Sequence, residues 1–275
     1  MIDDLRVEPG QAAGLRQRAT DDRLGLTDKA AGIEEARTLN ERLRGLQERL
    51  WAEHRQRLLV VLQAMDTGGK DGVIEHVFGG LNPQGIKVTG FKAPSPDELA
   101  HDYLWRVHPH VPGHGEIAIF NRSHYEDVVV VRVHGLVPEA VWRGRYRHLR
   151  EFERILAEEG TTIVKLFLHI SPAEQEARLR ARLADPNKRW KFRVGDLGDR
   201  QRWYDFQAAY EDAISETSTS WAPWYVVPAD RKWVRNVAVG RLIVATLEHL
   251  DPHFPPPEEN LDAVVVPPVN PPASG

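Results

Sequence analysis

The hydrophobic positions of the chain form two kinds of pattern, a helical stripe and several short apolar runs. Leu39, Leu43, Leu46 and Leu50 recur at spacings of four, three and four residues, which is the period of one apolar face of a helix. We therefore predict a helix over roughly residues 33–54. Its stripe should pack on the rest of the domain or on a second subunit.

The apolar runs predict strands that alternate with helices. Residues 58–62, LLVVL, have the length and β-branched content of a buried strand. Further strands are predicted over residues 86–90, 116–120, 162–170 and 224–227. Ser95 and Ser171 should cap helices, since each is followed by Pro and, three residues on, by Glu. This alternation predicts an α/β fold with a mostly parallel sheet and ligands at the carboxyl ends of its strands.

Composition divides the chain into three parts. Residues 1–32 are polar and contain Pro9 and Gly10, so we predict an N-terminal arm outside the core. Residues 252–275 include PPPEE and PPVNPP and should form an extended tail without chemistry. Residues 33–251 are expected to form one domain, because α/β chains of this length often do.

The overall charge and the absence of cysteine exclude several classes of protein. A net charge of −4 argues against a protein that coats nucleic acid or an anionic membrane. No run of about 18 apolar residues and no basic leader before an apolar core is present, so neither membrane insertion nor secretion is predicted. Without cysteine there is no disulfide, thiolate nucleophile or cysteine zinc site, which fits a cytoplasmic protein.

A glycine-rich turn follows the first predicted strand. Residues 64–72 read AMDTGGKDG, and Gly68 and Gly69 can bring backbone amides onto an anion just before Lys70. The turn nearly matches the P-loop pattern GxxxxGK[ST]. It lacks the first glycine and the hydroxyl residue of that pattern, which are replaced by alanine and aspartate.

Asp66 is an unusual residue for such a turn. A carboxylate among phosphates is repelled unless a metal ion or a proton offsets the charge. Asp66 is therefore either part of a metal site or a sign that no phosphate binds here.

A second polar group follows the strand predicted over residues 116–120. Asn121 comes directly after this strand, and Glu126 and Asp127 are the nearest carboxylates that could hold Mg²⁺. Arg122 at the same rim could clamp a phosphate with two hydrogen bonds. The alternative is a polar loop with ordinary surface charges.

A cationic segment lies within this acidic protein. Residues 178–202 contain nine Lys or Arg residues and only three acidic residues. A mobile basic segment over a phosphate site would act as a lid that neutralises transferring phosphates and excludes water. The alternative is a solvated helix face.

The three motifs AMDTGGKDG, FNRSHYED and KRWKFRVGDL occur in this order. With them the chain resembles the polyphosphate kinase 2 family over roughly residues 35–250. The resemblance implies a three-layer α/β/α, P-loop kinase-like fold with a mostly parallel sheet and a helical lid over about residues 178–200. It also implies a phosphotransferase that moves phosphate from inorganic polyphosphate to nucleotides by in-line transfer, with Mg²⁺ or alternatively Mn²⁺ as cofactor, in a homodimer or homotetramer.

The resemblance also assigns roles to single residues. Asp66, Lys70 and Arg122 are the implied catalytic residues, and the amides of Thr67, Gly68 and Gly69 complete the phosphate cradle. Polyphosphate contacts are implied for Arg178, Arg182, Arg189 and Arg193. The metal ligands are expected among Asp66, Asn121, Glu126 and Asp127. Asn121 and Glu126 are also candidates on the acceptor side, together with Phe91, which would either stack on a purine or pack in the core.

The second motif indicates the acceptor. Many relatives that act mainly on nucleoside diphosphates have FDRSxYN, whereas this chain has FNRSHYE. This variant resembles the subgroup that phosphorylates both mono- and diphosphates, so conversion of AMP to ADP and of ADP to ATP is expected, with guanine nucleotides as further candidates. Two alternatives stay open, an ATP-dependent nucleoside monophosphate kinase and a non-catalytic nucleotide- or polyphosphate-binding module.

Overall fold

The computed structural model describes residues 2–258 and 261–269. Within this part of the chain the strands form one sheet in the order β1-β6-β5-β2-β4-β3. The strands are β1 (Arg6–Val7), β2 (Arg57–Ala64), β3 (Ile86–Gly90), β4 (Ile117–Asn121), β5 (Thr161–His169) and β6 (Trp224–Pro228). β2 to β6 run parallel, and β1 joins the edge of β6 antiparallel. The expected mostly parallel sheet is confirmed.

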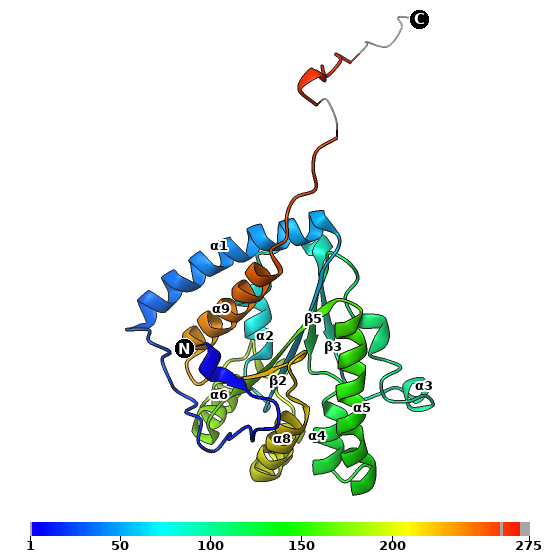
Figure 1. Ribbon diagram of the computed structural model, residues 1–275. Helices are drawn as coiled ribbons and strands as arrows, with labels where there is room; N and C mark the ends of the chain where they lie inside the picture. The colour runs from blue at the N-terminus through cyan, green and yellow to red at the C-terminus, as the bar shows by residue number, and fades with distance from the viewer. Residues whose placement is uncertain (1, 259–260, 270–275) are drawn as a thin grey trace, which may run out of the picture.

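Helices cover both faces of the sheet (Figure 1). The α-helices are α1 (Lys29–Glu53), α2 (Lys70–Val73), α3 (Pro96–Leu99), α4 (Glu126–Val133), α5 (Glu139–Glu158), α6 (Pro172–Ala184), α7 (Gly195–Gln201), α8 (Trp203–Thr217) and α9 (Lys232–Leu250). α1 and α9 pack together on one face, and α4, α5 and α8 pack together on the other. This is the expected three-layer α/β/α fold.

The central strand β2 shows why its sequence is a continuous apolar run. It pairs with β4 on one side and with β5 on the other, and Leu58 to Ala64 are all buried. A parallel strand with helices on both faces has no solvent-facing side, so its residues need not alternate. The prediction for residues 58–62 is confirmed, and the carboxyl end of β2 delivers the glycine-rich turn to the sheet edge.

The predicted amphipathic helix is α1, and its apolar stripe packs on α9. Leu43, Leu46 and Leu50 are buried. The helix begins four residues earlier than predicted because the Asp28 carboxylate caps it by accepting a hydrogen bond from the amide of Ala31 (2.9 Å).

The first residues of the chain take part in the core. Leu5, Val7, Leu15 and Leu24 are buried in the main hydrophobic cluster. The Glu211 carboxylate on α8 accepts hydrogen bonds from the amides of Gly14 and Leu15, both at 2.7 Å. The arm expected over residues 1–32 therefore differs from the prediction, since its described residues add a strand to the sheet and supply the first turn of α1.

A charged network lies inside the domain, between β5 and α5. The Lys165 ammonium donates to the Glu153 carboxylate (2.6 Å) and to the Tyr125 hydroxyl (2.9 Å), and both charged side chains are fully buried. Burial lowers the pKa of Lys165 to about 8, although Glu153 opposes this. Burial alone would raise the pKa of Glu153. The charge of Lys165 and the hydrogen bond from His124 outweigh burial, so the pKa of Glu153 is lower than normal. The pair therefore stays ionised within the core at neutral pH.

The carboxyl-terminal segment leaves the domain after α9 (Figure 1). Its described residues are almost all exposed and contain one short 3-10 helix, Leu261–Ala263. Of the tail predicted over residues 252–275, positions 259–260 and 270–275 lie outside the described residues. Among the described helices, none has the length and apolar character needed to cross a membrane.

Candidate active site

The glycine-rich turn connects β2 to α2 with an unusual backbone. Thr67 has a φ of 64° and Gly69 a φ of 102°, the left-handed region that glycine adopts most easily. A Cβ at Gly68 would collide with the side chain of Ala64, and a Cβ at Gly69 would collide with the guanidinium of Arg235. The close approach of Ala64 thus requires glycine at position 68, whereas the left-handed backbone favours glycine at position 69.

The Thr67 hydroxyl is buried, yet it has no hydrogen-bond partner among the described residues. Buried polar groups are nearly always hydrogen-bonded in native proteins. An unpartnered donor within a turn of this shape fits a phosphate oxygen as its missing partner. The amide of Gly68 already donates to the carbonyl oxygen of Met65 (2.9 Å). Of the expected cradle of Thr67, Gly68 and Gly69, the Thr67 hydroxyl is therefore the side-chain group with unused hydrogen-bonding capacity for an anion.

Lys70 lies at the start of α2 and is buried. Its ammonium donates to the carbonyl oxygen of Ala64 (3.1 Å), which also accepts a hydrogen bond from the Tyr210 hydroxyl (3.2 Å). Burial, followed by the positive charge of Arg122, lowers the pKa of Lys70 to about 8. Lys70 is therefore charged at neutral pH but close to losing its proton.

We expect anion binding to take up a proton at Lys70. A bound phosphate favours the charged ammonium and raises its pKa, so at pH 8 about half a proton should be taken up per site. Below about pH 7 the lysine is already protonated and uptake should vanish, whereas affinity should fall as the pH rises above 8. Calorimetry of tripolyphosphate binding in two buffers of different ionisation enthalpy measures this.

A Lys70→Met variant serves as the control for that titration, because it reports the protons exchanged by the ligand itself. The difference between the two proteins isolates Lys70. Equal proton uptake by both at pH 8 would refute the assignment.

Asp66 and Arg122 meet across the site. The Asp66 carboxylate accepts a hydrogen bond from one Arg122 terminal nitrogen (2.7 Å), and Glu126 accepts one from the other (3.2 Å). Arg122 itself has a φ of 63° at the end of β4, a conformation that only a well-held loop keeps for a non-glycine residue. The charge of Glu126 raises the pKa of Arg122 above its already high normal value. Burial opposes this increase, and the charge of Asp66 adds to it. The structure brings these three predicted residues together.

The remaining predicted metal ligands separate into two groups. The Asn121 side-chain amide donates to the Asp71 carboxylate (2.7 Å) beside the turn. Asp127 instead lies 3.6 Å from both Arg106 and Arg145, and burial raises its pKa. Asp127 is thus paired with two arginines, and its role as a metal ligand stays a prediction.

The described residues contain no cluster of three or more His, Cys, Asp or Glu arranged for a metal ion. Asp66, Glu126 and Asn121 nevertheless offer two carboxylates and an amide oxygen at one rim of the turn. Mg²⁺ is commonly held by one or two carboxylates together with substrate phosphates and water. The donor set fits Mg²⁺ when phosphate oxygens complete its coordination.

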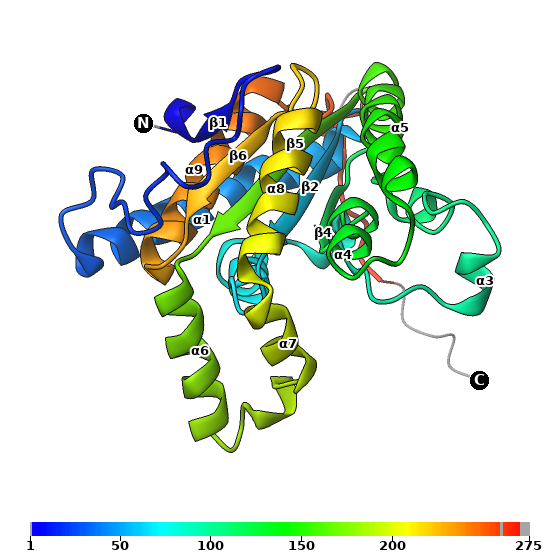
Figure 2. The ribbon, with the colours of Figure 1, turned by 90° about the horizontal axis from the view of Figure 1, so that it is seen from below.

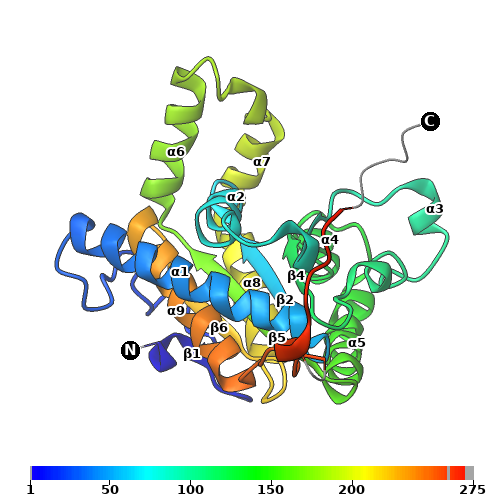
Figure 3. The same ribbon diagram turned by 90° about the horizontal axis from the view of Figure 1, so that it is seen from above.

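The cationic segment forms a projecting hairpin of α6 and α7, joined by the short 3-10 helix η5 (Arg189–Lys191) (Figure 2). The hairpin stands beside α2 and away from the sheet (Figure 3). Arg189 and Arg193 are exposed on it, and Arg182 is half-buried. Their positions fit a lid with cations available to a polyanion.

Arg178 has a different environment from the other lid arginines. It is buried, and it donates to the carbonyl oxygens of Thr67 (3.0 Å) and Gly68 (3.1 Å) and to the Glu174 carboxylate (2.7 Å). In this structure its guanidinium holds the turn from the lid side, which differs from the direct polyphosphate contact expected from the sequence.

Phe91 belongs to the core. It is buried, and its ring meets that of Phe120 edge to face at a centroid distance of 4.9 Å. The purine-stacking role considered for Phe91 is therefore corrected to a packing role, because its faces are covered by the protein.

Several site residues were missed by the sequence reasoning. Gln175 donates to the carbonyl oxygen of Asp66 (3.1 Å), and Tyr210 reaches the turn from α8. Burial and then the charge of Asp66 raise the pKa of Asp196 on the lid. Only Asp196 had a sequence signal, since it lies within the lid motif.

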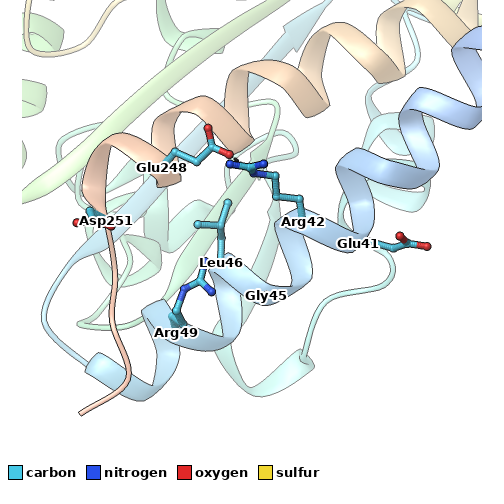
Figure 4. A pocket seen from close by; sticks show the side chains of 7 residues that line it. All are labelled: Glu41, Arg42, Gly45, Leu46, Arg49, Glu248 and Asp251. Carbon is cyan, nitrogen blue, oxygen red and sulfur yellow. Dashed lines mark ion pairs between the residues drawn. The ribbon is translucent and has the colours of Figure 1, made fainter. Parts of the chain in front are cut away.

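A separate groove of about 520 Å³ lies between α1 and α9, where Arg42 and Glu248 form an ion pair (Figure 4). α9 begins beside the glycine-rich turn with Arg235, whereas Glu248 lies near its other end. This groove is thus remote from the site and takes no part in it.

Comparisons with known proteins find similar sequences and a similar solved structure. The family model described as polyphosphate kinase 2 matches residues 26–255. An AMP/ADP-polyphosphate phosphotransferase of Meiothermus ruber is 56% identical over 262 residues, which cover 95% of this chain and 98% of the relative. An ADP-polyphosphate phosphotransferase of Rhodopseudomonas palustris is 48% identical, with 80% of each chain covered. The crystal structure of polyphosphate kinase 2 from Arthrobacter aurescens superposes with a TM-score of 0.91 at 44% identity and covers 95% of this chain and 93% of its own.

Proposed function

The chain belongs to the polyphosphate kinase 2 family, and from this premise we propose that it transfers phosphate from inorganic polyphosphate to AMP and to ADP. The single observation that carries the acceptor range is the 56% identity, over nearly the whole of both chains, to a relative named for both acceptors. The alternative of an ATP-dependent nucleoside monophosphate kinase is not favoured by these relatives.

The site supports a transfer without a covalent enzyme intermediate. In the proposed reaction an oxygen of the acceptor phosphate forms a bond to the terminal phosphorus of polyphosphate, and the bridging oxygen leaves with the shortened chain. Phosphoryl transfer of this kind depends on positioning and charge neutralisation rather than on a protein nucleophile. Lys70, the Thr67 hydroxyl and the amides of Thr67 and Gly69 would hold the phosphates, while Arg122 would neutralise the charge that develops on the leaving oxygen.

Asp66 and Glu126 would hold Mg²⁺ together with Asn121. These side chains would keep the metal ion beside the phosphates, where its charge would offset their mutual repulsion. Asp66 also holds Arg122 in place in the present arrangement (2.7 Å), so it can orient a cation toward the reacting phosphates. The lid cations Arg182, Arg189 and Arg193 would neutralise the polyphosphate chain.

Three further proposals accompany this function. We propose a homodimer or homotetramer, as expected from the family, and guanine nucleotides as additional acceptors. We propose the cytoplasm as the location, which the absence of cysteine supports.

The acceptor range is tested by incubating the purified protein with AMP, Mg²⁺ and polyphosphate. We expect ADP to appear first and ATP to follow as ADP accumulates, because both acceptors use one site. Formation of ADP without ATP would restrict the enzyme to monophosphates. No product from either AMP or ADP would overturn the proposal.

A further inference from the structure

Arg235 on α9 is a buried arginine without an opposite charge. Only 2% of the residue is exposed, and its Nε and Nη2 atoms both donate to the neighbouring Asn236 side chain (3.1 and 2.8 Å). It forms no ion pair within residues 2–258 and 261–269. Burying an unpaired charge is costly, so this residue is not explained by the stability of the fold.

The guanidinium of Arg235 lies directly against the phosphate-binding turn. Its Nη1 atom occupies the space that a Cβ of Gly69 would need, and its Nη2 atom lies 3.0 Å from the place of a Cβ at Gly72. Arg178 approaches Gly69 from the lid. Two buried cations therefore flank the turn, and only Arg178 has a carboxylate partner, Glu174.

We propose that Arg235 is a fixed cation of the phosphate site, which attracts the phosphates held in the turn through its uncompensated charge. The ligand is a condensed phosphate, so this inference rests on the proposed function. A group of several negative charges in the turn would supply the opposite charge that Arg235 lacks. The attraction acts across the backbone of Gly69 at short range and through a low-dielectric region, where screening is weak.

Burial, and then Arg178, lower the pKa of Arg235 to about 10. Arg235 therefore keeps its charge at neutral pH in spite of its surroundings.

The same helix supplies a matched control. Arg241 lies on α9 and binds the Glu35 carboxylate through Nε (2.5 Å) and Nη2 (2.9 Å) and the carbonyl oxygen of Leu24 (3.1 Å). It ties α9 to α1 and to the N-terminal arm, and it lies six residues beyond Arg235 along the helix. Arg235→Gln and Arg241→Gln thus remove the same charge from an unpaired and from a paired site.

The experiment measures tripolyphosphate binding by calorimetry and the thermal unfolding of the full-length protein with and without tripolyphosphate. For Arg235→Gln we expect a Kd about tenfold higher, a free-protein Tm equal to or above that of the wild type, and a smaller increase in Tm on binding. For Arg241→Gln we expect a lower Tm and an unchanged Kd.

An unchanged Kd for Arg235→Gln would overturn the proposal. A higher Kd together with a lower free-protein Tm would also overturn it, because weaker binding would then follow from a damaged turn. The readout needs no turnover, so it is separate from the proposed function. If the protein bound tripolyphosphate through Arg235 but transferred no phosphate from polyphosphate, the proposed phosphotransferase function would be refuted and the role of Arg235 would stand.

Discussion

Replacing Asp66 with asparagine is expected to lower kcat by about 10²-fold or more, with the affinities for AMP and tripolyphosphate changed by no more than about threefold. Asparagine has the same shape but no charge, so it can still accept a hydrogen bond from Arg122, which Asp66 accepts at 2.7 Å. The variant would lose the charge that orients Arg122 and helps hold Mg²⁺. This loss matters most in the transition state, when negative charge develops on the leaving oxygen. Steady-state kinetics and equilibrium binding on the same preparation measure both quantities.

Asp205→Asn, an exposed carboxylate on α8, is the control for the loss of one negative charge and should retain full activity. If Asp66→Asn turned over at the wild-type rate, Asp66 would have no part in the transfer. If it lost substrate affinity in proportion to its rate, Asp66 would act in binding and not in the transition state.

Replacing Lys165 with methionine is expected to lower the free energy of unfolding by about 3–5 kcal/mol. The variant leaves the Glu153 carboxylate fully buried without the ammonium that now lies 2.6 Å away. A buried carboxylate without a counter-charge must either bind a proton or remain strained, and both lower stability. Urea denaturation at neutral pH measures the loss.

The double variant Lys165→Met, Glu153→Gln separates the ion pair from the packing. With both charges removed, we expect most of the lost stability to return, because no unpaired ion is left in the core. A double variant as unstable as Lys165→Met would show that the side-chain shape, and not the charge on Glu153, causes the effect.

The central layers of the fold could be predicted because their patterns are local. β2 is a continuous apolar run, and the helices beginning at Pro96 and Pro172 carry Ser95 and Ser171 caps that the structure confirms. The contribution of the N-terminus was not predictable in this way. β1 is only two residues long, and the amides of Gly14 and Leu15 are satisfied by Glu211, almost 200 positions later.

The candidate site also has a part that the sequence could predict and a part that it could not. The turn with Asp66 and Lys70 and the rim with Arg122 and Glu126 each follow a strand that could be recognised, and parallel strands bring such ends together. The role of Arg178 depends on contacts with Thr67 and Gly68, more than 100 residues apart in sequence. Charge alone could not distinguish this buried arginine from the exposed lid cations.

Donor choice is the most direct test of the central claim that this site takes phosphate from polyphosphate. The measurement compares initial rates of ADP formation from AMP with polyphosphate or with ATP as the donor, at equal concentrations of transferable phosphate and with Mg²⁺ present. We predict a clear preference for polyphosphate, and a rate from polyphosphate that is about 10²-fold or more lower in Asp66→Asn. A clear preference for ATP would contradict the account and identify the protein as an ATP-dependent nucleoside monophosphate kinase.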